Sequence, residues 1–130
     1  LAVSTDALTA NPDVNAIFGI NDDSTQGAIQ AYKSSGLDMN KLVAVGFGLE
    51  GSVGREALLN NTPVKAELAM FPEYVGALLV ESAVKAYNGG QLPERVVTPT
   101  VMITPDTYKD FYKQEGNDWI LDFSVVEAVR

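Results

Sequence analysis

Residues 46–51, GFGLEG, have the spacing G-x-G-x-x-G and directly follow the apolar run LVAV. In dinucleotide-binding folds, glycines at this spacing turn a strand tightly into a helix, whose N-terminus then binds a pyrophosphate. Such a loop belongs to the first strand–helix unit of its sheet, and an acidic residue ends the next strand about 20 residues further on. Here another strand–helix pair comes first, and Glu67 lies inside the next apolar run rather than at its end. The stretch is therefore either a plain strand-to-helix turn or, as an alternative, the loop of a nucleotide-binding enzyme. A Walker loop is excluded because no Gly-Lys-Ser/Thr follows.

A second polar group, NDDS, also follows an apolar run and contains the adjacent carboxylates Asp22 and Asp23. Paired carboxylates can bind a metal ion, but Asp at the start of a helix more often caps free backbone N–H groups and suits the positive end of the helix dipole. Gln26 stands three residues after Asp23, which is capping-box spacing. We therefore expect Asp22 or Asp23 to cap a helix, and we expect no metal site.

The composition excludes several classes of function. The chain has no cysteine and no histidine, which excludes thiol catalysis, Cys-containing zinc sites, disulfides and His-based triads. Its net charge of -8, without a basic cluster, makes it a poor partner for nucleic acid. No nucleophile–base pair is evident, so we expect neither catalytic residues nor a cofactor.

Short apolar runs alternate with helical patterns along the chain. The predicted strands are residues 14–20, 42–47 and 64–70, and the predicted helices begin near Asp22, at residue 52 and at Pro72. This alternation predicts an α/β fold with a parallel, doubly wound sheet. Nearer the C-terminus, the sequence predicts an extended segment over 97–104, a short helix over 106–114, and either a strand or a helix after Gly116.

Ligands of such sheets bind where the parallel strands end at their carboxyl side. These ends are residues 19–23, 46–51 and 69–73. We therefore expect the three segments to meet and to form the binding site.

Three stretches of the chain, in this order, resemble the second lobe of type I periplasmic binding proteins. These are the sugar-binding receptors of ABC transporters, and they are related to the ligand-binding part of LacI-type repressors. The stretches are NPDVNAIFGINDDSTQGAIQAYKSSG, VAVGFGLEG and VKAELAMFPEYVGALLVESAVKAYNGG. The likeness runs from about Leu8 to Thr104.

The resemblance implies which residues would contact a ligand. Asn21 matches the family's asparagine that hydrogen-bonds sugar hydroxyls, and Asp22 follows it in the same motif. Gly48 stands where the family carries an aspartate that accepts from two hydroxyls, and Met70 stands where an Asn or Gln often contacts the sugar. Because buried hydroxyls must be paired, these two departures argue against a simple pentose or hexose. Glu50 could supply a replacement carboxylate, or it could be a solvated charge at a helix start.

The resemblance also implies a function: the solute-binding component of an ABC transporter, which binds a sugar-like ligand between two lobes without catalysis. The full-length protein would be periplasmic or otherwise extracytoplasmic and would contact the transporter permease. The alternative is the ligand-sensing domain of a LacI-type regulator. Because 130 residues are too few for both lobes, we expect one fragment. Residues 1–70 would form second-lobe units, 71–104 would return between the lobes, and 105–130 would be a C-terminal extension.

The helix predicted over residues 72–88 carries an apolar stripe that needs cover. The stripe consists of Val75, Leu78, Leu79 and Ala83. We expect either a homodimer, with or without exchanged segments, or folding of this helix back onto the sheet. With half of the cleft absent, we expect the chain alone to bind sugar weakly or not at all.

Overall fold

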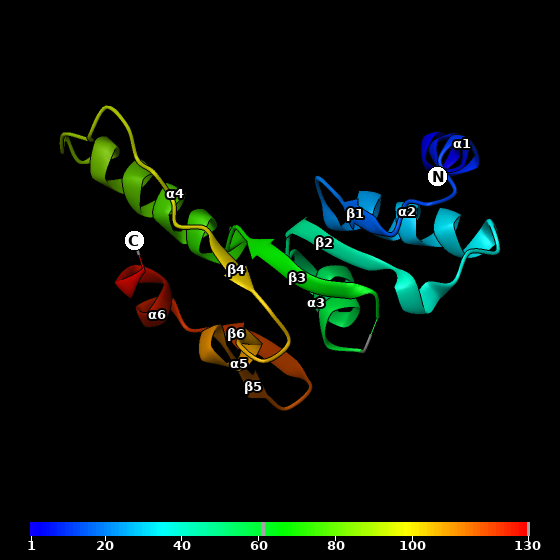
Figure 1. Ribbon diagram of the computed structural model, residues 1–130. Coiled ribbons are helices and arrows are strands. Elements are labelled where there is room, and N and C mark those ends of the chain that lie inside the picture. The colour runs from blue at the N-terminus through cyan, green and yellow to red at the C-terminus, as the bar shows by residue number, and fades with distance from the viewer. Residues whose placement is uncertain (61, 130) are drawn as a thin grey trace.

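The computed structural model describes residues 1–60 and 62–129 and contains a four-stranded sheet beside a two-stranded hairpin (Figure 1). The sheet has the spatial order β1 (Ala16–Phe18), β2 (Val43–Gly48), β3 (Val64–Ala69) and β4 (Val101–Ile103). The first three strands are parallel, as the alternation of strands and helices predicts. The α/β class with a parallel-dominated sheet is confirmed.

Strand β4 departs from the parallel arrangement because it runs antiparallel to β3. The intervening helix α4 (Pro72–Tyr87) leads away from the carboxyl end of β3, and the chain returns alongside it (Figure 1). The returning chain therefore enters the sheet at the end where β3 leaves it. Its register places Val101 beside Ala69 and Ile103 beside Glu67.

The helices that follow the parallel strands lie where the sequence predicts them. Helix α2 (Asp22–Ser34) packs on β1 and β2, and α3 (Gly51–Leu59) packs on β3. A short 3-10 helix, η1 (Met39–Lys41), precedes β2. Helix α1 (Ala2–Ala10), which packs on α2, was not predicted, because Leu8 is its only buried residue and no apolar stripe reveals it.

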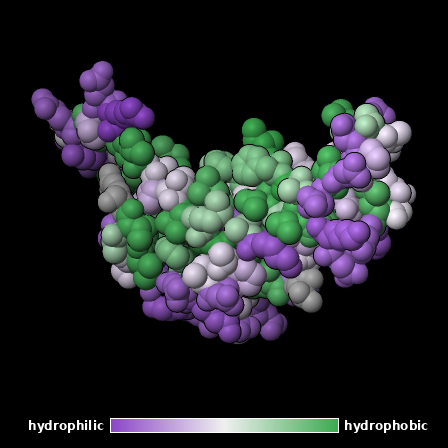
Figure 2. Space-filling view, in the orientation of Figure 1, coloured by the Kyte–Doolittle hydropathy of each residue, from purple (hydrophilic) through white to green (hydrophobic). Residues whose placement is uncertain are grey.

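Much of helix α4 is not covered by the rest of the described chain. Tyr74 is its only buried residue, and the side chains of Leu79 and Val80 are 66% and 65% exposed. The helix projects from the sheet in Figure 1, and green apolar surface continues along its base in Figure 2. The expectation that this helix folds back onto the sheet is therefore wrong. Its direction is set at Phe71, whose left-handed backbone (φ 52°) turns the chain outward before Pro72 starts the helix.

The C-terminal part corrects a second prediction. The helix expected over residues 106–114 is only α5 (Tyr108–Phe111), and the chain continues as β5 (Tyr112–Glu115) and β6 (Asp118–Leu121), which form an antiparallel hairpin. Glycine and asparagine fill the two turn positions, and Gly116 has the positive φ (62°) that such turns favour. The tail was predicted as strand or helix and contains both, because α6 (Phe123–Ala128) follows β6.

Aromatic side chains dock this C-terminal segment onto the start of α4. The Phe111 ring stacks on Phe71 with 5.6 Å between the ring centroids. Tyr108, which is 1% exposed, stacks on Tyr112 at 4.6 Å and meets the edge of Trp119 at 5.1 Å. The segment is therefore part of the same core as the strand ends. Within the described ranges, no helix is long and apolar enough to cross a membrane.

Candidate functional site

The carboxyl ends of the three parallel strands lie side by side. The Gly19 amide, just after β1, donates to the Val45 carbonyl of β2 at 3.0 Å, and the Met70 amide, just after β3, donates to the Gly48 carbonyl at 3.2 Å. The segments that the sequence places at a common edge therefore do meet there.

A hollow of about 250 Å³ opens at this edge, between the first turns of α2 and α3. It is lined by Asn21, Asp22, Asp23, Glu50 and Val53. The structure thus brings together three of the five predicted site residues. The other two, which are Gly48 and Met70, do not line this hollow. Asp23 and Val53 line it without having been predicted as site residues.

Asn21 is the N-cap of α2, which corrects the prediction that Asp22 or Asp23 has this role. Its backbone is extended, and its Oδ1 accepts a hydrogen bond from the Ser24 amide at 2.8 Å. The helix therefore starts two residues earlier than the capping-box spacing of Asp23 and Gln26 suggests. Capping uses only the oxygen of the amide, so the side-chain nitrogen of Asn21 remains available as a donor toward the hollow.

Asp22 ties the two helices together. Its side chain is 6% exposed, and its Oδ2 accepts a hydrogen bond from the Glu50 amide at 2.7 Å, at the start of α3. The position suits a carboxylate because the first N–H groups of a helix carry its positive end. This oxygen is therefore engaged by protein, and Asp22 holds the end of β2 against α2.

Gly48 is a position where the backbone itself requires glycine. Its φ is 125°, a conformation that L side chains rarely adopt. A Cβ built there would lie 3.3 Å from Cγ of Glu50, so the Glu50 side chain leans over the glycine. The exposed Glu50 carboxylate thus stands beside the place where the predicted sugar-binding aspartate is missing.

Backbone strain is concentrated at the same edge. Among the described residues, Leu49 (φ 54°) and Phe71 (φ 52°) are the non-glycine residues with positive φ. Leu49 directly follows β2 and Phe71 comes two residues after β3, and both side chains are buried, at 3% and 0% exposed. Each such residue destabilises the fold by roughly 1–3 kcal/mol and persists only where the surrounding packing holds it in place. Strained residues of this kind cluster at ligand and active sites. Met70, half-buried, lies between β3 and this strained position.

Glu67 is a charged residue near the site that sequence reasoning assigned no role. It is 0% exposed in the middle of β3, and neither carboxyl oxygen has a hydrogen-bond partner in the described part of the chain. Burial, and next the charge of the neighbouring Asp22, raises the pKa of Glu67 to about 7. A Cβ on Gly46 would lie 2.1 Å from its Oε2. The first glycine of GFGLEG therefore makes room for a buried carboxyl, and Glu67 is not placed to bind a ribose as the nucleotide alternative requires.

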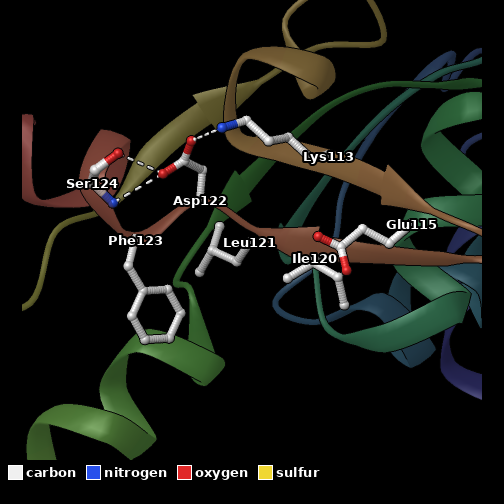
Figure 3. Close-up of a pocket in the computed structure, with 7 residues that line it drawn as sticks. All are labelled: Lys113, Glu115, Ile120, Leu121, Asp122, Phe123 and Ser124. Atoms are coloured by element: carbon white, nitrogen blue, oxygen red, sulfur yellow. Dashed lines mark hydrogen bonds and ion pairs between the residues drawn. The ribbon is translucent and has the colours of Figure 1, made fainter.

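Another hollow, of about 470 Å³, lies on the C-terminal hairpin (Figure 3). Lys113 and Ser124 both hydrogen-bond Asp122 there, and these bonds lower the pKa of Asp122 to about 2. The hollow contains none of the predicted site residues, and its acid is already paired. No group of three metal-binding side chains occurs within residues 1–60 and 62–129.

Comparison with known proteins relates the chain to sugar-import proteins, although no protein-family model matches it. The ribose import binding protein RbsB of Escherichia coli (strain K12) is 36% identical over 89 residues, which cover 68% of this chain and 29% of that protein. RbsB of Bacillus subtilis (strain 168) is 30% identical over 104 residues, covering 80% of this chain and 32% of that protein. The chain thus matches about a third of the length of these relatives.

Solved structures agree with the sequence relatives. A periplasmic solute-binding protein of an ABC transporter from Actinobacillus succinogenes 130z, with bound D-allose, has a TM-score of 0.75 and 26% identity over 85% of this chain and 38% of that one. A carbohydrate transporter solute-binding protein from Agrobacterium radiobacter, in complex with D-arabinose, shares the fold over 99% of this chain and 38% of that one, with a TM-score of 0.71 and 22% identity. This chain is therefore homologous to the ribose import binding proteins and structurally similar to the sugar-binding periplasmic proteins of ABC transporters.

Proposed function

We propose that this chain supplies one wall of the ligand cleft in a sugar-binding component of an ABC transporter, located outside the cytoplasm. The observation that carries the proposal is the pairing of a donor with an acceptor at the strand ends: the side-chain amide of Asn21 and the exposed carboxylate of Glu50 line one hollow. Capture then occurs by hydrogen bonding and closure of the cleft. No catalytic step is part of the proposal.

The ligand class is a small polyhydroxylated molecule. The Asn21 nitrogen donates to a hydroxyl oxygen, and Glu50 accepts from a hydroxyl in place of the carboxylate absent at Gly48. The relatives support this class, because their names and bound ligands are ribose, D-allose and D-arabinose. Met70 would present an apolar, adaptable surface at the third strand end.

The proposed organisation assigns residues 1–70 to the second-lobe strand–helix units, 71–104 to the return between lobes and 105–130 to a C-terminal extension. The chain matches only 29% and 32% of the length of its relatives, which supports the view that it corresponds to part of one such protein. Contact with the transporter permease then involves parts of the protein other than the hollow described above.

An Asn21→Asp substitution is expected to separate ligand binding from helix capping. Aspartate keeps an oxygen for the Ser24 amide, so the midpoint of thermal unfolding should stay within about 2 °C, because Asn and Asp cap equally well. Sugar binding should weaken about tenfold or more, because a ligand hydroxyl loses its donor and faces a carboxylate instead. Titration with D-ribose, D-allose and D-arabinose, followed by NMR shifts of the Glu50 and Ser24 amides, measures both effects even for millimolar affinity.

The matched control is Asn117→Asp, the same change at an exposed turn residue of the hairpin. It should leave the sugar-induced shifts unchanged. Because half of the cleft is absent, the unmodified chain is expected to respond only at millimolar sugar. If Asn21→Asp responds as strongly as the unmodified chain, the assignment of the site is wrong.

We propose further that the uncovered face of α4 mediates self-association of this chain. An apolar groove of about 230 Å³ runs between α4 and residues 92–98, and Leu79 lies in it with 66% of its surface exposed. Exposed apolar patches of this kind drive association.

Sedimentation velocity should show that the unmodified chain forms a dimer. The dissociation constant of this dimer should rise at least tenfold in Leu79→Asp. The control Val3→Asp, at an exposed position of α1, should leave the dissociation constant unchanged. A monomer at all concentrations would contradict this proposal.

A further inference from the structure

Glu67 and Asp22 are buried acids at the edge of the proposed site: Asp22 lines the hollow, and its charge acts on the neighbouring Glu67. The Glu67 carboxyl comes from β3 and Asp22 from the first turn of α2, and their side chains are 0% and 6% exposed. Three atoms of the pair have no hydrogen-bond partner in the described part of the chain, namely Asp22 Oδ1 and both carboxyl oxygens of Glu67. Two buried carboxylates cannot satisfy each other, because neither can donate.

Glycines on two elements create the space that the pair occupies. A Cβ on Gly46 of β2 would lie 2.1 Å from Glu67 Oε2, and a Cβ on Gly54 of α3 would lie 2.4 Å from Asp22 Oδ2. Neither glycine has the positive φ that would require glycine for the backbone's sake. The packing is therefore shaped around the two carboxyls.

The surroundings decide which acid carries a negative charge and which carries a proton. Asp22 Oδ2 accepts from the Glu50 amide at 2.7 Å, where the positive end of α3 favours a carboxylate. Glu67 lies between Gly46 of β2 and Ile103 of β4, which supply no charge. A proton on Glu67 would satisfy the pair, because the acid O–H could then donate to the free Oδ1 of Asp22.

The other charged residues on the elements packed around β3 do not offset the pair. On α2, Asp23 and Lys33 are exposed, and on α3, Glu56 is exposed. Arg55 of α3 acts instead on the hydroxyls of Tyr108 and Tyr112. Asp22 is the charged group that acts on Glu67 within the described ranges.

We propose that Glu67 is a positioning residue of the strand-end site: as a protonated acid it donates to Asp22, which in turn holds the Glu50 amide at the end of β2. That this loop carries a ligand group rests on the sugar-binding function proposed above. The positioning itself concerns only this chain and can be measured without any ligand.

The arrangement makes the loop sensitive to pH. The pKa of Glu67 is raised in the folded chain to about 7 from the value of 4.5 expected when the chain is unfolded. The folded state therefore keeps a proton that the unfolded state releases, and stability falls as the pH rises from about 4.5 to about 7. Above that range Glu67 is ionised beside Asp22, and repulsion between the two acids loosens the contact with Glu50.

The Glu67→Gln substitution tests the inference, because glutamine has the same shape, can donate to Asp22 and does not titrate. Denaturant unfolding from pH 4.5 to pH 8.5 should show the folding equilibrium constant of the unmodified chain falling by roughly 100-fold relative to that of Glu67→Gln. Corrected hydrogen exchange at the Glu50 amide should become at least about tenfold faster above pH 7 in the unmodified chain and stay flat in Glu67→Gln. The Asn60 amide, which bonds Glu56 at the far end of α3, serves as an internal reference.

Glu56→Gln is the matched control, because it makes the same change at an exposed carboxyl of α3. It should keep the pH dependence of the unmodified chain at both readouts. The carboxyl carbon resonance of Glu67 in the unmodified chain adds a measurement that needs no variant, and it should titrate near pH 7.

Two results would overturn the inference. One is a Glu67 resonance that titrates near pH 4.5, and the other is a Glu50 amide whose exchange follows the same pH profile in Glu67→Gln as in the unmodified chain. Neither measurement contains a sugar. Equal sugar responses of Asn21→Asp and the unmodified chain therefore overturn the proposed function alone, and an ordinary titration of Glu67 overturns the positioning role alone.

Discussion

Replacing Tyr108 by alanine should lower the free energy of unfolding by about 3–5 kcal/mol, the range for removing a large aromatic side chain from a core. The ring is 1% exposed, stacks on Tyr112 at 4.6 Å and meets the edge of Trp119 at 5.1 Å. Its loss leaves a cavity between α5 and the C-terminal hairpin. Because Phe111 of the same helix stacks on Phe71, the damage should spread to the strained loop after β3.

Tyr87→Ala is the matched control, because the same ring at the end of α4 is 91% exposed. Its effect should remain within about 0.5 kcal/mol, as for most surface substitutions. Urea unfolding followed by circular dichroism measures both variants. Equal effects at the two positions would show that residues 105–129 are not docked as described, and that the extension is not part of the core.

Replacing Gly19 by alanine should destabilise the chain by about 2–3 kcal/mol, at the upper end of the usual cost of overpacking. A Cβ at this position would lie 1.9 Å from Oγ1 of Thr25 and 2.8 Å from its Cα. The second contact is with backbone, so a side-chain rotation cannot relieve it. The first turn of α2 must move away from β1, which displaces Asn21, and sugar binding should weaken together with stability.

Gly76→Ala is the control for this change. Gly76 lies inside α4, and a Cβ there would meet nothing within 4 Å. Alanine should therefore stabilise the helix by up to about 1 kcal/mol, because it restricts the unfolded chain and has a higher helix propensity. Thermal and urea unfolding of the pair distinguish a steric clash from a general effect of Gly→Ala. A stable Gly19→Ala variant would mean that β1 and α2 are not packed this closely.

The parallel α/β unit and the edge where its strands end could both be predicted from the residues alone. Apolar runs of strand length alternate with helical stripes, and parallel strands joined by helices must present their carboxyl ends on one side. The residues predicted at that edge, among them Asn21 and Glu50, do lie together there. The resemblance carried by NPDVNAIFGINDD and its following stretches led to the same family as the structural comparison.

It was harder to predict which of several neighbouring residues would cap a helix. Asn21, Asp22 and Asp23 are all good helix caps, and only the backbone geometry shows that Asn21 has the role while Asp22 turns inward to the Glu50 amide. The C-terminal hairpin was missed for a related reason. Its strands are four residues each, too short for periodicity to outweigh the helical pattern that precedes them.

Two features depend on contacts between residues far apart in the sequence, and no local pattern predicts them. The direction of α4 depends on the left-handed backbone of Phe71, which the packing of Phe111 holds in place. The role of Glu67 depends on its closeness to Asp22, which lies 45 positions earlier in the sequence. The glycines Gly46 and Gly54 leave the space for the two carboxyls. A pattern within one segment reports which face is apolar, whereas the protonation of a buried acid depends on which distant charge becomes its neighbour.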